Sequence, residues 1–528
     1  MVAKKPFVRA RDWVWVAGAA RARRLKARGA AWLHYAARVR RDALLLSAVT
    51  LLGAACERGV TPQAKVDPAP SAANSAAATQ AALSERTGAL VAPAGQPLAT
   101  VPPPVSAAAA DPPSKPRVYV KNRYVFVRPR PDVNADWLGF LWFGASVELR
   151  SAEPVRGPGC ATFYAIEPTG FVCVDEKQAT LSPGDPVFVA VSAYAPRLDQ
   201  ASPHRYARSL GAELRSQIPG VPSQLPALPA LFHEPRRRLL PSSTLAYVDE
   251  ATEDGKSWLR SADLLWLPKA QVSLYPEITF HGVELGGEWR LPLAFFRRAG
   301  ARKYRRNAQG QLERGDESFT LHQVLALSDR IEIRRGERFF QAAHGDDWVR
   351  ERDAVLPTPR SQTPWGARVG QEDRTGRAPK DSRQTWIEVS VMGGWLLAFE
   401  GTKPVFATLI SAGTGGIPQE GKNTLESSAT PLGTFAISGK LATVTLEAPG
   451  EALHSDVPWT QNFQKHYAIH TAYWHDNWGN LASAGCINVS PIDGKWLFDF
   501  SEPKLPSGWH AVRWQPATGA TTQLVVHE

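Results

Sequence analysis

Two residues near the end of the chain could act together as a base and a nucleophile. His470 lies in an apolar, strand-like run, residues 467–471, and Cys486 follows shortly afterwards in a Gly-containing turn, residues 483–489. The thiolate is the attacking form of cysteine, and a nearby imidazole can take the thiol proton or stabilise the thiolate as an ion pair. These residue types at this spacing therefore predict covalent catalysis by a cysteine.

The same side chains have two other possible uses. Both could be core residues, as buried histidine and cysteine often are. They could also bind zinc together with His466 and His475, since imidazole and thiolate are the ligands that zinc prefers. The catalytic interpretation accounts for the pair and for the motifs around it at once. We therefore expect neither a metal nor a cofactor.

The cysteine count supports a reactive role for Cys486, because the chain has only four cysteines. Cys160 and Cys173 lie close together in the sequence, between strand-like runs, which predicts a local disulfide in an exported protein. Cys56 ends the leader described next. Cys486 is then the one thiol without a partner, and such a thiol is a candidate reactive group.

The leader, residues 1–55, is typical of a signal sequence for export. It carries a net charge of +10 out of +11 for the whole chain, and its basic part is followed by the apolar run 43–52. The end of the leader resembles a bacterial lipobox, which implies a lipid on Cys56 and a membrane anchor, although Gly53 stands where that motif usually has leucine. The alternative is an ordinary secretory peptide cut nearby. We expect a protein exported to the periplasm or cell envelope.

The charge of the remaining chain excludes one class of partner. From Cys56 onward the net charge is only +1, and no basic stripe with interleaved aromatic residues occurs. We therefore expect no nucleic-acid binding. A local basic cluster at 295–306 is interpreted as a solvated face, with weak binding to wall carboxylates as the alternative.

The elements before the catalytic pair predict a mainly β chain. Residues 56–116, rich in Ala and Pro, are expected to be a disordered tether. Short alternating runs in 117–181 resemble a bacterial SH3-like barrel, and residues 182–358 hold a polar turn followed by Trp258 and again by Trp348, which suggests a degenerate repeat of such modules. Residues 204–217 are expected to be helical because Leu210 and Leu214 are spaced by four, residues 359–384 a linker, and residues 385–528 the last domain.

The last domain resembles a known family in the order of its motifs. Strand-like runs with Gly turns are followed by the blocks 411–413, 430–435 and 457–459, and then by the His470 and Cys486 blocks. This order, with a Ser-x-Gly-Cys-x-Asn block, is similar to the L,D-transpeptidase catalytic domain, also called YkuD. The resemblance covers residues 385–526 and implies a YkuD-type β-sandwich.

The resemblance implies a reaction on the stem peptides of peptidoglycan. Cys486 would attack the amide before the terminal D-alanine of a tetrapeptide stem, and a side-chain amine of a second stem would resolve the thioester to form a 3-3 cross-link. His470 would be the base, oriented by the backbone carbonyl of Thr471. Amides around Gly485 and Cys486 would form the oxyanion hole. Substrate contacts are expected from the following residues: Ser483, Asn488, Trp459, Tyr473 and Trp474.

Two departures from the family pattern leave alternatives open. Ala484 stands where the family usually has histidine, and Thr471 stands where it usually has glycine. The thioester could then be given to water, as in an L,D-carboxypeptidase or amidase, or the domain could be a non-catalytic peptidoglycan-binding scaffold. His475 or His466 could replace the missing ring. Each aromatic residue named above could equally be a core residue, and the oligomeric state is not predicted.

Overall fold

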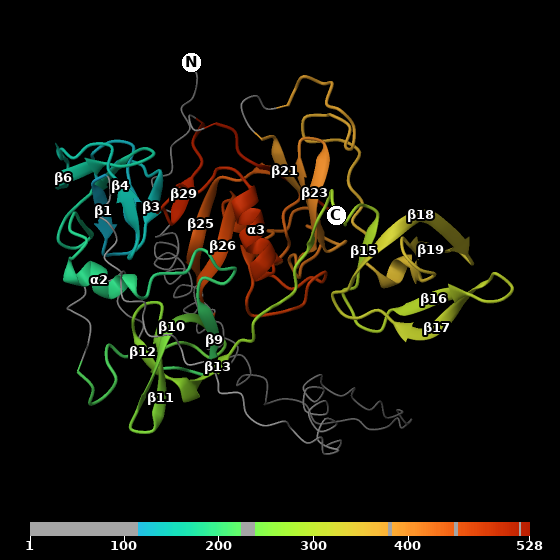
Figure 1. The fold of residues 1–528 in the computed structure, drawn as a ribbon, viewed down its shortest axis with the longest axis horizontal. Coiled ribbons are helices and arrows are strands. Elements are labelled where there is room, and N and C mark those ends of the chain that lie inside the picture. The colour runs from blue at the N-terminus through green and yellow to red at the C-terminus, as the bar shows by residue number, and fades with distance from the viewer. Residues whose placement is uncertain (1–114, 223–237, 379–382, 448–451, 517–518) are drawn as a thin grey trace, which may run out of the picture. The chain divides into compact units, whose positions relative to one another are not determined.

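The computed structural model describes residues 115–222, 238–378, 383–447, 452–516 and 519–528 (Figure 1). The predicted leader, Cys56 and the predicted tether up to residue 114 lie outside the described residues. Strands dominate the described part, which holds two α-helices, α2 (Pro186–Ser192) and α3 (Pro491–Phe500). The predicted mainly β fold is confirmed. None of the described helices is long and apolar enough to cross a membrane.

The last domain consists of two sheets packed on a common core. Ile387 and Leu396 of the first sheet pack against Ile469 and Ile487 of the second. This confirms the two-sheet sandwich that the sequence predicts. The first sheet runs in the order β14 (Val283–Glu284), β23 (Lys403–Leu409), β22 (Trp395–Glu400), β21 (Thr385–Ser390), β30 (Gln523–His527) and β24 (Gly433–Ala436). The second contains β25 (Gly439–Leu446), β26 (His454–Gln464), β27 (Tyr467–Thr471), β28 (Ile487–Val489) and β29 (Ala511–Arg513).

The first sheet is buried on both faces, so the domain includes chain from before residue 385. All six residues of β21 are buried. On the face away from the second sheet, Trp386 and Phe399 pack with Phe280 and Phe295. The predicted linker also lies against this domain, because the amide of Arg360 donates to the buried Glu388 carboxylate. The segments before β21 therefore complete the core of the domain that contains His470 and Cys486.

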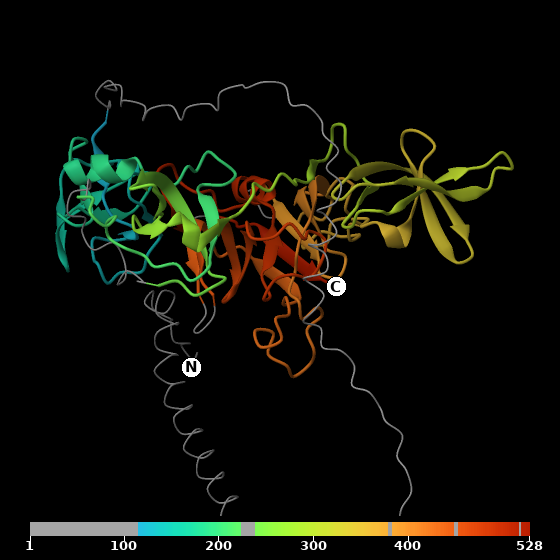
Figure 2. The same ribbon diagram turned by 90° about the horizontal axis from the view of Figure 1, so that it is seen from below.

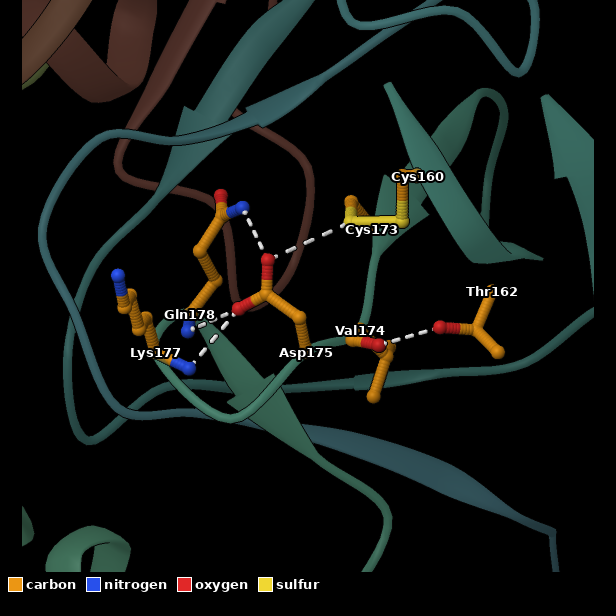
Figure 3. Close-up of a disulfide and its surroundings, with 7 residues drawn as sticks. All are labelled: Cys160, Thr162, Cys173, Val174, Asp175, Lys177 and Gln178. Atoms are coloured by element: carbon orange, nitrogen blue, oxygen red, sulfur yellow. Dashed lines mark hydrogen bonds between the residues drawn. A yellow bond between two sulfur atoms is a disulfide. The ribbon is translucent and has the colours of Figure 1, made fainter. Parts of the chain in front are cut away.

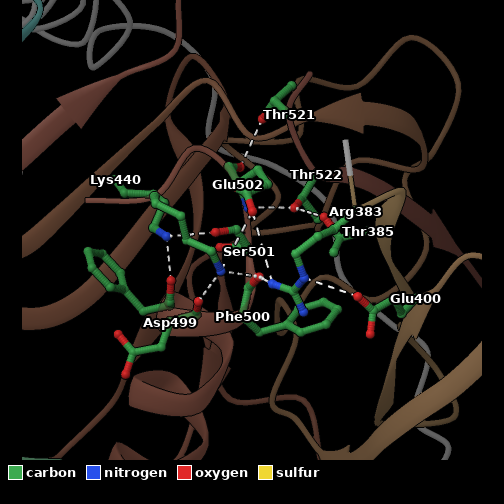
Figure 4. Close-up of polar contacts among 12 residues, drawn as sticks. Arg383, Thr385, Glu400, Lys440, Asp499, Phe500, Ser501, Glu502, Thr521 and Thr522 are labelled. Carbon is green, nitrogen blue, oxygen red and sulfur yellow. Dashed lines mark hydrogen bonds and ion pairs between the residues drawn. The ribbon is translucent and has the colours of Figure 1, made fainter. Parts of the chain in front are cut away.

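Helix α3 follows β28 directly and packs against β26 and β27 (Figure 1). It begins at the N-cap Ser490, whose Oγ accepts from the Asp493 amide at 3.1 Å, and Pro491 occupies the first turn. At its other end, Lys440 Nζ donates to the carbonyls of Phe498 and Ser501 (Figure 4). Burial lowers the pKa of Lys440 to about 7. Both helix ends are thus satisfied by side chains, which fixes β28 at one end of the helix.

The second sheet continues into the middle of the chain and corrects one prediction. Residues 204–217 are not helical: Arg205–Ser209 form β9, paired antiparallel with β10 and β13. The spacing of Leu210 and Leu214 suggested a helix, but Leu210 is 60% exposed and the strand pairs on both sides determine the structure. The further strands of this sheet are β2 (Val125–Val127), β3 (Gly139–Leu141), β9 (Arg205–Ser209), β10 (Thr244–Glu253), β11 (Lys256–Ser261), β12 (Trp266–Pro268) and β13 (Val272–Leu274), with a short 3-10 turn, Lys269–Gln271.

The first described region contains the expected disulfide. Cys160 and Cys173 are joined with an Sγ–Sγ distance of 2.03 Å between β6 and β7, and Thr162 Oγ1 donates to the Val174 carbonyl beside them (Figure 3). Small apolar residues such as Val118 and Val125 fill the adjacent core. The strands are β1 (Arg117–Val120), β4 (Ser146–Glu148) and β8 (Ala179–Thr180) in one sheet, and β5 (Val155–Gly157), β6 (Cys160–Ala165) and β7 (Phe171–Cys173) in another. The SH3-like assignment of this region stays a prediction.

Strands β15 to β20 form a sheet of their own (Figure 2). Phe296, Phe319 and Val349 are part of its apolar core. The two turns of the suggested repeat lead into different sheets, with Trp258 on β11 and Trp348 on β20, and the repeat stays a prediction. The strands are β15 (Leu293–Phe295), β16 (Arg302–Arg306), β17 (Leu312–Ser318), β18 (Val324–Arg334), β19 (Glu337–Ala342) and β20 (Trp348–Arg350), followed by a 3-10 turn, Glu351–Asp353.

Candidate active site

Parallel pairing of β27 and β28 brings the predicted base and nucleophile together. His470 lies opposite Asn488, and Ile469 lies opposite Ile487. Cys486 comes one residue before β28, so the alternation of side chains along a strand places Cys486, Asn488 and His470 on the same face of the sheet. One strand spacing and two residues of rise separate the backbones of His470 and Cys486 by roughly 8 Å. Side chains of these lengths can meet across that distance.

The His470 ring is held in one tautomer by the main chain. Nδ1 lies 3.0 Å from the Thr471 carbonyl oxygen, which can only accept, so Nδ1 carries the proton. The ring is 3% exposed, and this burial lowers the pKa of His470 to about 4, against the opposite effect of the Thr471 hydrogen bond. At neutral pH the imidazole is therefore uncharged, and Nε2 is its basic nitrogen.

The Asn488 carboxamide connects two imidazoles. Its Nδ2 lies 3.1 Å from His470 Nε2, and its Oδ1 lies 3.3 Å from His475 Nε2. The main chain of Asn488 is fixed independently, because its amide donates to the Ser411 carbonyl at 2.8 Å and its carbonyl accepts from the Ser411 amide at 2.9 Å. Asn488 is buried and anchored on both sides of its side chain.

The Cys486 thiol lies near the start of β27, the strand that carries His470. Sγ donates to the His466 carbonyl oxygen at 3.8 Å. The residue is partly exposed, and desolvation of the side chain raises the pKa of the thiol to about 11, partly offset by the Ala468 amide. Within the described residues, no hydrogen bond joins Sγ to His470. The resting pair is a neutral thiol beside a neutral imidazole, and the thiol must turn toward Nε2 to be deprotonated.

The turn that carries Cys486 requires glycine at position 485. Gly485 has φ +122°, and a Cβ there would lie 2.8 Å from Tyr467 Cε1 and 3.1 Å from the Ala429 oxygen. Ser483 Oγ accepts from the Gly485 amide at 3.0 Å and donates to the Cys486 carbonyl at 2.5 Å. The Gly485 amide is thus used within the turn. Of the two amides predicted for the oxyanion hole, the one that remains a candidate is that of Cys486.

The structure brings only one of the three predicted aromatic residues to the pair. The Trp474 ring lies 6.0 Å from the His470 ring, centroid to centroid, and stacks on His454. Tyr473 is buried, with its hydroxyl donating to the Ser455 carbonyl at 2.7 Å. Trp459 is 2% exposed, and its Nε1 donates to the Ala201 carbonyl at 2.6 Å. Enclosure of these two residues by partners from earlier in the chain favours the alternative that they are core residues, and their contact with substrate stays a prediction.

Two residues near the pair were not predicted to act there. Ser411 holds Asn488 through the main chain, and its Oγ donates to the Asn477 carbonyl at 2.8 Å. Its signal was present, because the block 411–413 belongs to the motif order noted in the sequence. Asn477 has no comparable signal. In the part of the chain that the structure describes, no three His, Cys, Asp or Glu side chains are placed to hold a metal ion.

Comparison with known proteins finds a family model that matches part of the chain. Residues 384–510 match the family model of YkuD, the L,D-transpeptidase catalytic domain. No curated protein sequence matches the chain. Among solved structures, an L,D-transpeptidase from Xylanimonas cellulosilytica is 21% identical over 28% of this chain and 63% of its own, with a TM-score of 0.20.

Two further solved structures are similar to the chain. An L,D-transpeptidase from Enterococcus faecium is 23% identical over 27% of this chain and 49% of its own, with a TM-score of 0.20. One from Mycobacterium smegmatis is 14% identical over 52% of this chain and 91% of its own, with a TM-score of 0.21. The chain spans less than two thirds of the length of the Xylanimonas and Enterococcus structures.

Proposed function

Starting from a YkuD domain at residues 384–510, we propose that this protein is a peptidoglycan L,D-transpeptidase that forms 3-3 cross-links through a cysteine acyl-enzyme. One observation carries the proposal. Cys486, the free thiol among the described cysteines, directly precedes β28, which pairs with the strand that carries His470, and the Thr471 carbonyl directs the basic nitrogen of His470. A nucleophile and an oriented base are the minimum set for acyl transfer.

The first half of the reaction forms a thioester. His470 Nε2 takes the Cys486 proton while Sγ attacks the carbonyl of the amide that joins L-lysine or meso-diaminopimelate to D-alanine. The C–N bond breaks, and the same proton passes from His470 to the departing D-alanine amine. The resting neutrality of both side chains suits this proton transfer, because deprotonation and attack then occur together in the bound complex.

The second half consumes the thioester. A side-chain amine of a second stem attacks the thioester carbonyl and gives up a proton to His470, the C–S bond breaks, and the proton returns to the sulfur. The products are a 3-3 cross-linked dimer and free enzyme. The export signal and a lipid on Cys56 would place this reaction in the periplasm or cell envelope, and the SH3-like modules would hold peptidoglycan near the site.

One observation favours a second candidate, hydrolysis of the same thioester. Ala484 is exposed beside Cys486, at the place where the family motif has an imidazole. A smaller side chain there leaves more room for water on the acceptor side. The protein would then act as an L,D-carboxypeptidase and release tripeptide stems.

Mass spectrometry of products and of the protein tests both candidates. The full chain is mixed with purified tetrapeptide muropeptides, beside Cys486→Ala and the surface control His344→Ala. Transfer predicts dimers and a thioester adduct on the Cys486 peptide, both lost in Cys486→Ala and kept in the control. Tripeptide without dimer indicates hydrolysis. Unchanged cross-linking by Cys486→Ala, or no adduct at all alongside intact binding to sacculi, overturns the proposal in favour of another site or a binding scaffold.

A further inference from the structure

A continuous chain of hydrogen bonds runs from the main chain beside His470 to the main chain beside His475. It passes from the Thr471 carbonyl to His470 at 3.0 Å, from His470 to Asn488 at 3.1 Å, and from Asn488 to His475 at 3.3 Å. His475 Nδ1 then accepts from the Asn477 amide at 3.3 Å. All of these residues belong to the last domain.

The two main-chain groups at the ends fix the direction of every bond between them. The Thr471 carbonyl can only accept, so His470 carries its proton on Nδ1 and accepts at Nε2. An amide N–H can only donate, so His475 accepts from Asn477 at Nδ1 and carries its proton on Nε2. Burial lowers the pKa of both rings, which keeps both uncharged at neutral pH, as this assignment requires.

Asn488 then has only one orientation that satisfies both neighbours. It must present its N–H groups to His470 Nε2 and its oxygen to His475 Nε2–H. The opposite orientation would set two donors against each other on the His475 side and two acceptors against each other on the His470 side. Such mismatches are costly in a buried site.

We infer that His475 is a positioning residue for the acyl transfer proposed above: its Nε2–H fixes the Asn488 carboxamide so that an N–H donor faces the basic nitrogen of His470. The inference rests on the proposed function for its consequence in turnover. The hydrogen bonds that support it lie within the protein and involve no substrate.

This arrangement makes protonated His470 a better acid. To take the Cys486 proton, Nε2 must release the Asn488 N–H from its single lone pair, and the carboxamide cannot turn its oxygen toward the new N–H while His475 holds that oxygen. The new proton on Nε2 is then left with two acceptors, the thiolate and afterwards the amine of the leaving group. His475 thereby favours delivery of the proton to the reacting atoms over its retention on the ring.

The surroundings of His475 suit a fixed rather than a mobile side chain. Its ring lies 4.8 Å from the Trp478 ring, and Ser411 holds the following turn through the Asn477 carbonyl. His475 reaches the site from the connection between β27 and β28, whereas position 484 in the family motif belongs to the turn before the cysteine. The ring missing at Ala484 is thus replaced by one that acts through Asn488. His466, the other histidine considered, is exposed and contributes its carbonyl to the thiol.

The pH dependence of Cys486 alkylation tests the inference without any peptidoglycan. The full chain, His475→Ala, His475→Gln and the surface control His344→Ala are treated with iodoacetamide, and the Cys486 peptide is followed by mass spectrometry. In His475→Ala the carboxamide is free to turn its oxygen to His470, which stabilises the imidazolium–thiolate pair. We expect the alkylation midpoint to move about one pH unit lower. Glutamine can place an N–H near the position of His475 Nε2, so His475→Gln should keep the wild-type midpoint.

The rate of cross-linking and the tautomer of His475 provide the second and third readouts. We expect kcat/KM for cross-linking to fall about tenfold in His475→Ala and to recover in His475→Gln. A wild-type midpoint in a folded His475→Ala, or equal loss in both variants, overturns the inference. If His475→Ala does not fold, imidazole nitrogen NMR of the wild-type chain decides: an Nδ1–H tautomer at His475 overturns the inference and an Nε2–H tautomer supports it. Absence of cross-linking with a shifted alkylation midpoint refutes the proposed function and leaves the positioning role supported.

Discussion

Polar side chains are arranged in opposite ways around His470 and on strands β16 and β17. Around His470 they are buried, few, and joined in one directed series through Asn488. On the two strands they are mostly exposed, numerous and paired by charge: Arg305 binds both Glu317 and Asp347, and Lys303 binds the same two carboxylates. Water screens the second set, and its members neutralise one another.

The two sets of polar side chains also differ in what shifts their pKa values. Burial moves the pKa of His470 to about 4 and that of Cys486 to about 11, because each charged form is desolvated. The exposed pairs hold the pKa of Glu317 below its usual value through hydrogen bonds from Arg305 and Lys303. Three cations of the predicted basic cluster at 295–306, Lys303, Arg305 and Arg306, already have carboxylate partners, and Phe295 and Phe296 within it are core residues. This favours the interpretation as a solvated face over wall binding.

The largest effect should come from the buried base. His470→Gln retains a polar side chain of similar size but cannot accept the thiol proton at neutral pH. We expect the rate of thioester formation to fall by about 10² to 10⁴. Single-turnover acylation followed by protein mass measures this, with Arg305→Gln as the matched change in the exposed network. Similar rates in wild type and His470→Gln would contradict the role of the base.

The second effect concerns stability in acid. The pKa of His470 is lowered from 6.5 to about 4 on folding, so the folded state resists protonation. The associated stability is fully present above pH 6.5 and is lost as the pH falls through 4, by up to about 3 kcal/mol. Melting of wild type and His470→Gln between pH 7 and pH 4 should show a smaller acid-dependent decrease in the variant. Parallel curves for the two proteins would show that His470 is not buried as an uncharged ring.

The smallest effect should come from the exposed network. Arg305→Ala removes a cation that is solvated and shares its carboxylates with Lys303. We expect a melting temperature close to that of wild type at low salt, a still smaller difference at high salt, and unchanged binding to sacculi. Loss of sacculus binding in this variant would restore the wall-binding interpretation of the basic cluster.

The sequence predicted the parts of the site that depend on local pattern. An apolar run with His470, a Gly-containing turn before Cys486, and two cysteines beside paired strands all have short-range signals. Helix α3 was not predicted, although Ser490, Pro491 and Asp493 form a usual helix start. The apolar residues of α3 come soon after those of β28. The change from the two-residue period of a strand to the longer period of a helix is therefore hard to recognise in the sequence.

The parts of the site that the sequence did not predict depend on partners far away in the chain. Tyr473 and Trp459 lie close to His470 in the sequence, yet their neighbours Thr244 and Ala201 come from much earlier segments. No local pattern distinguishes an aromatic residue that faces substrate from one that is enclosed by such a partner. Strand β9 replaces part of the expected helix for the same reason, since pairing with β10 and β13 outweighs the spacing of Leu210 and Leu214 that follow it.

In the parallel pair of β27 and β28, the distance between base and nucleophile and the course of the connecting segment are set by different parts of the chain. The distance between His470 and Cys486 is set by strand register and by the turn 483–486, whereas the connection 472–482 only has to cross from the end of one strand to that turn. Residues in this connection can change in identity, and its length can change, without moving base and nucleophile apart. The imidazole of His475 comes from this connection, so the group that orients Asn488 is placed independently of the register that sets the distance between base and nucleophile.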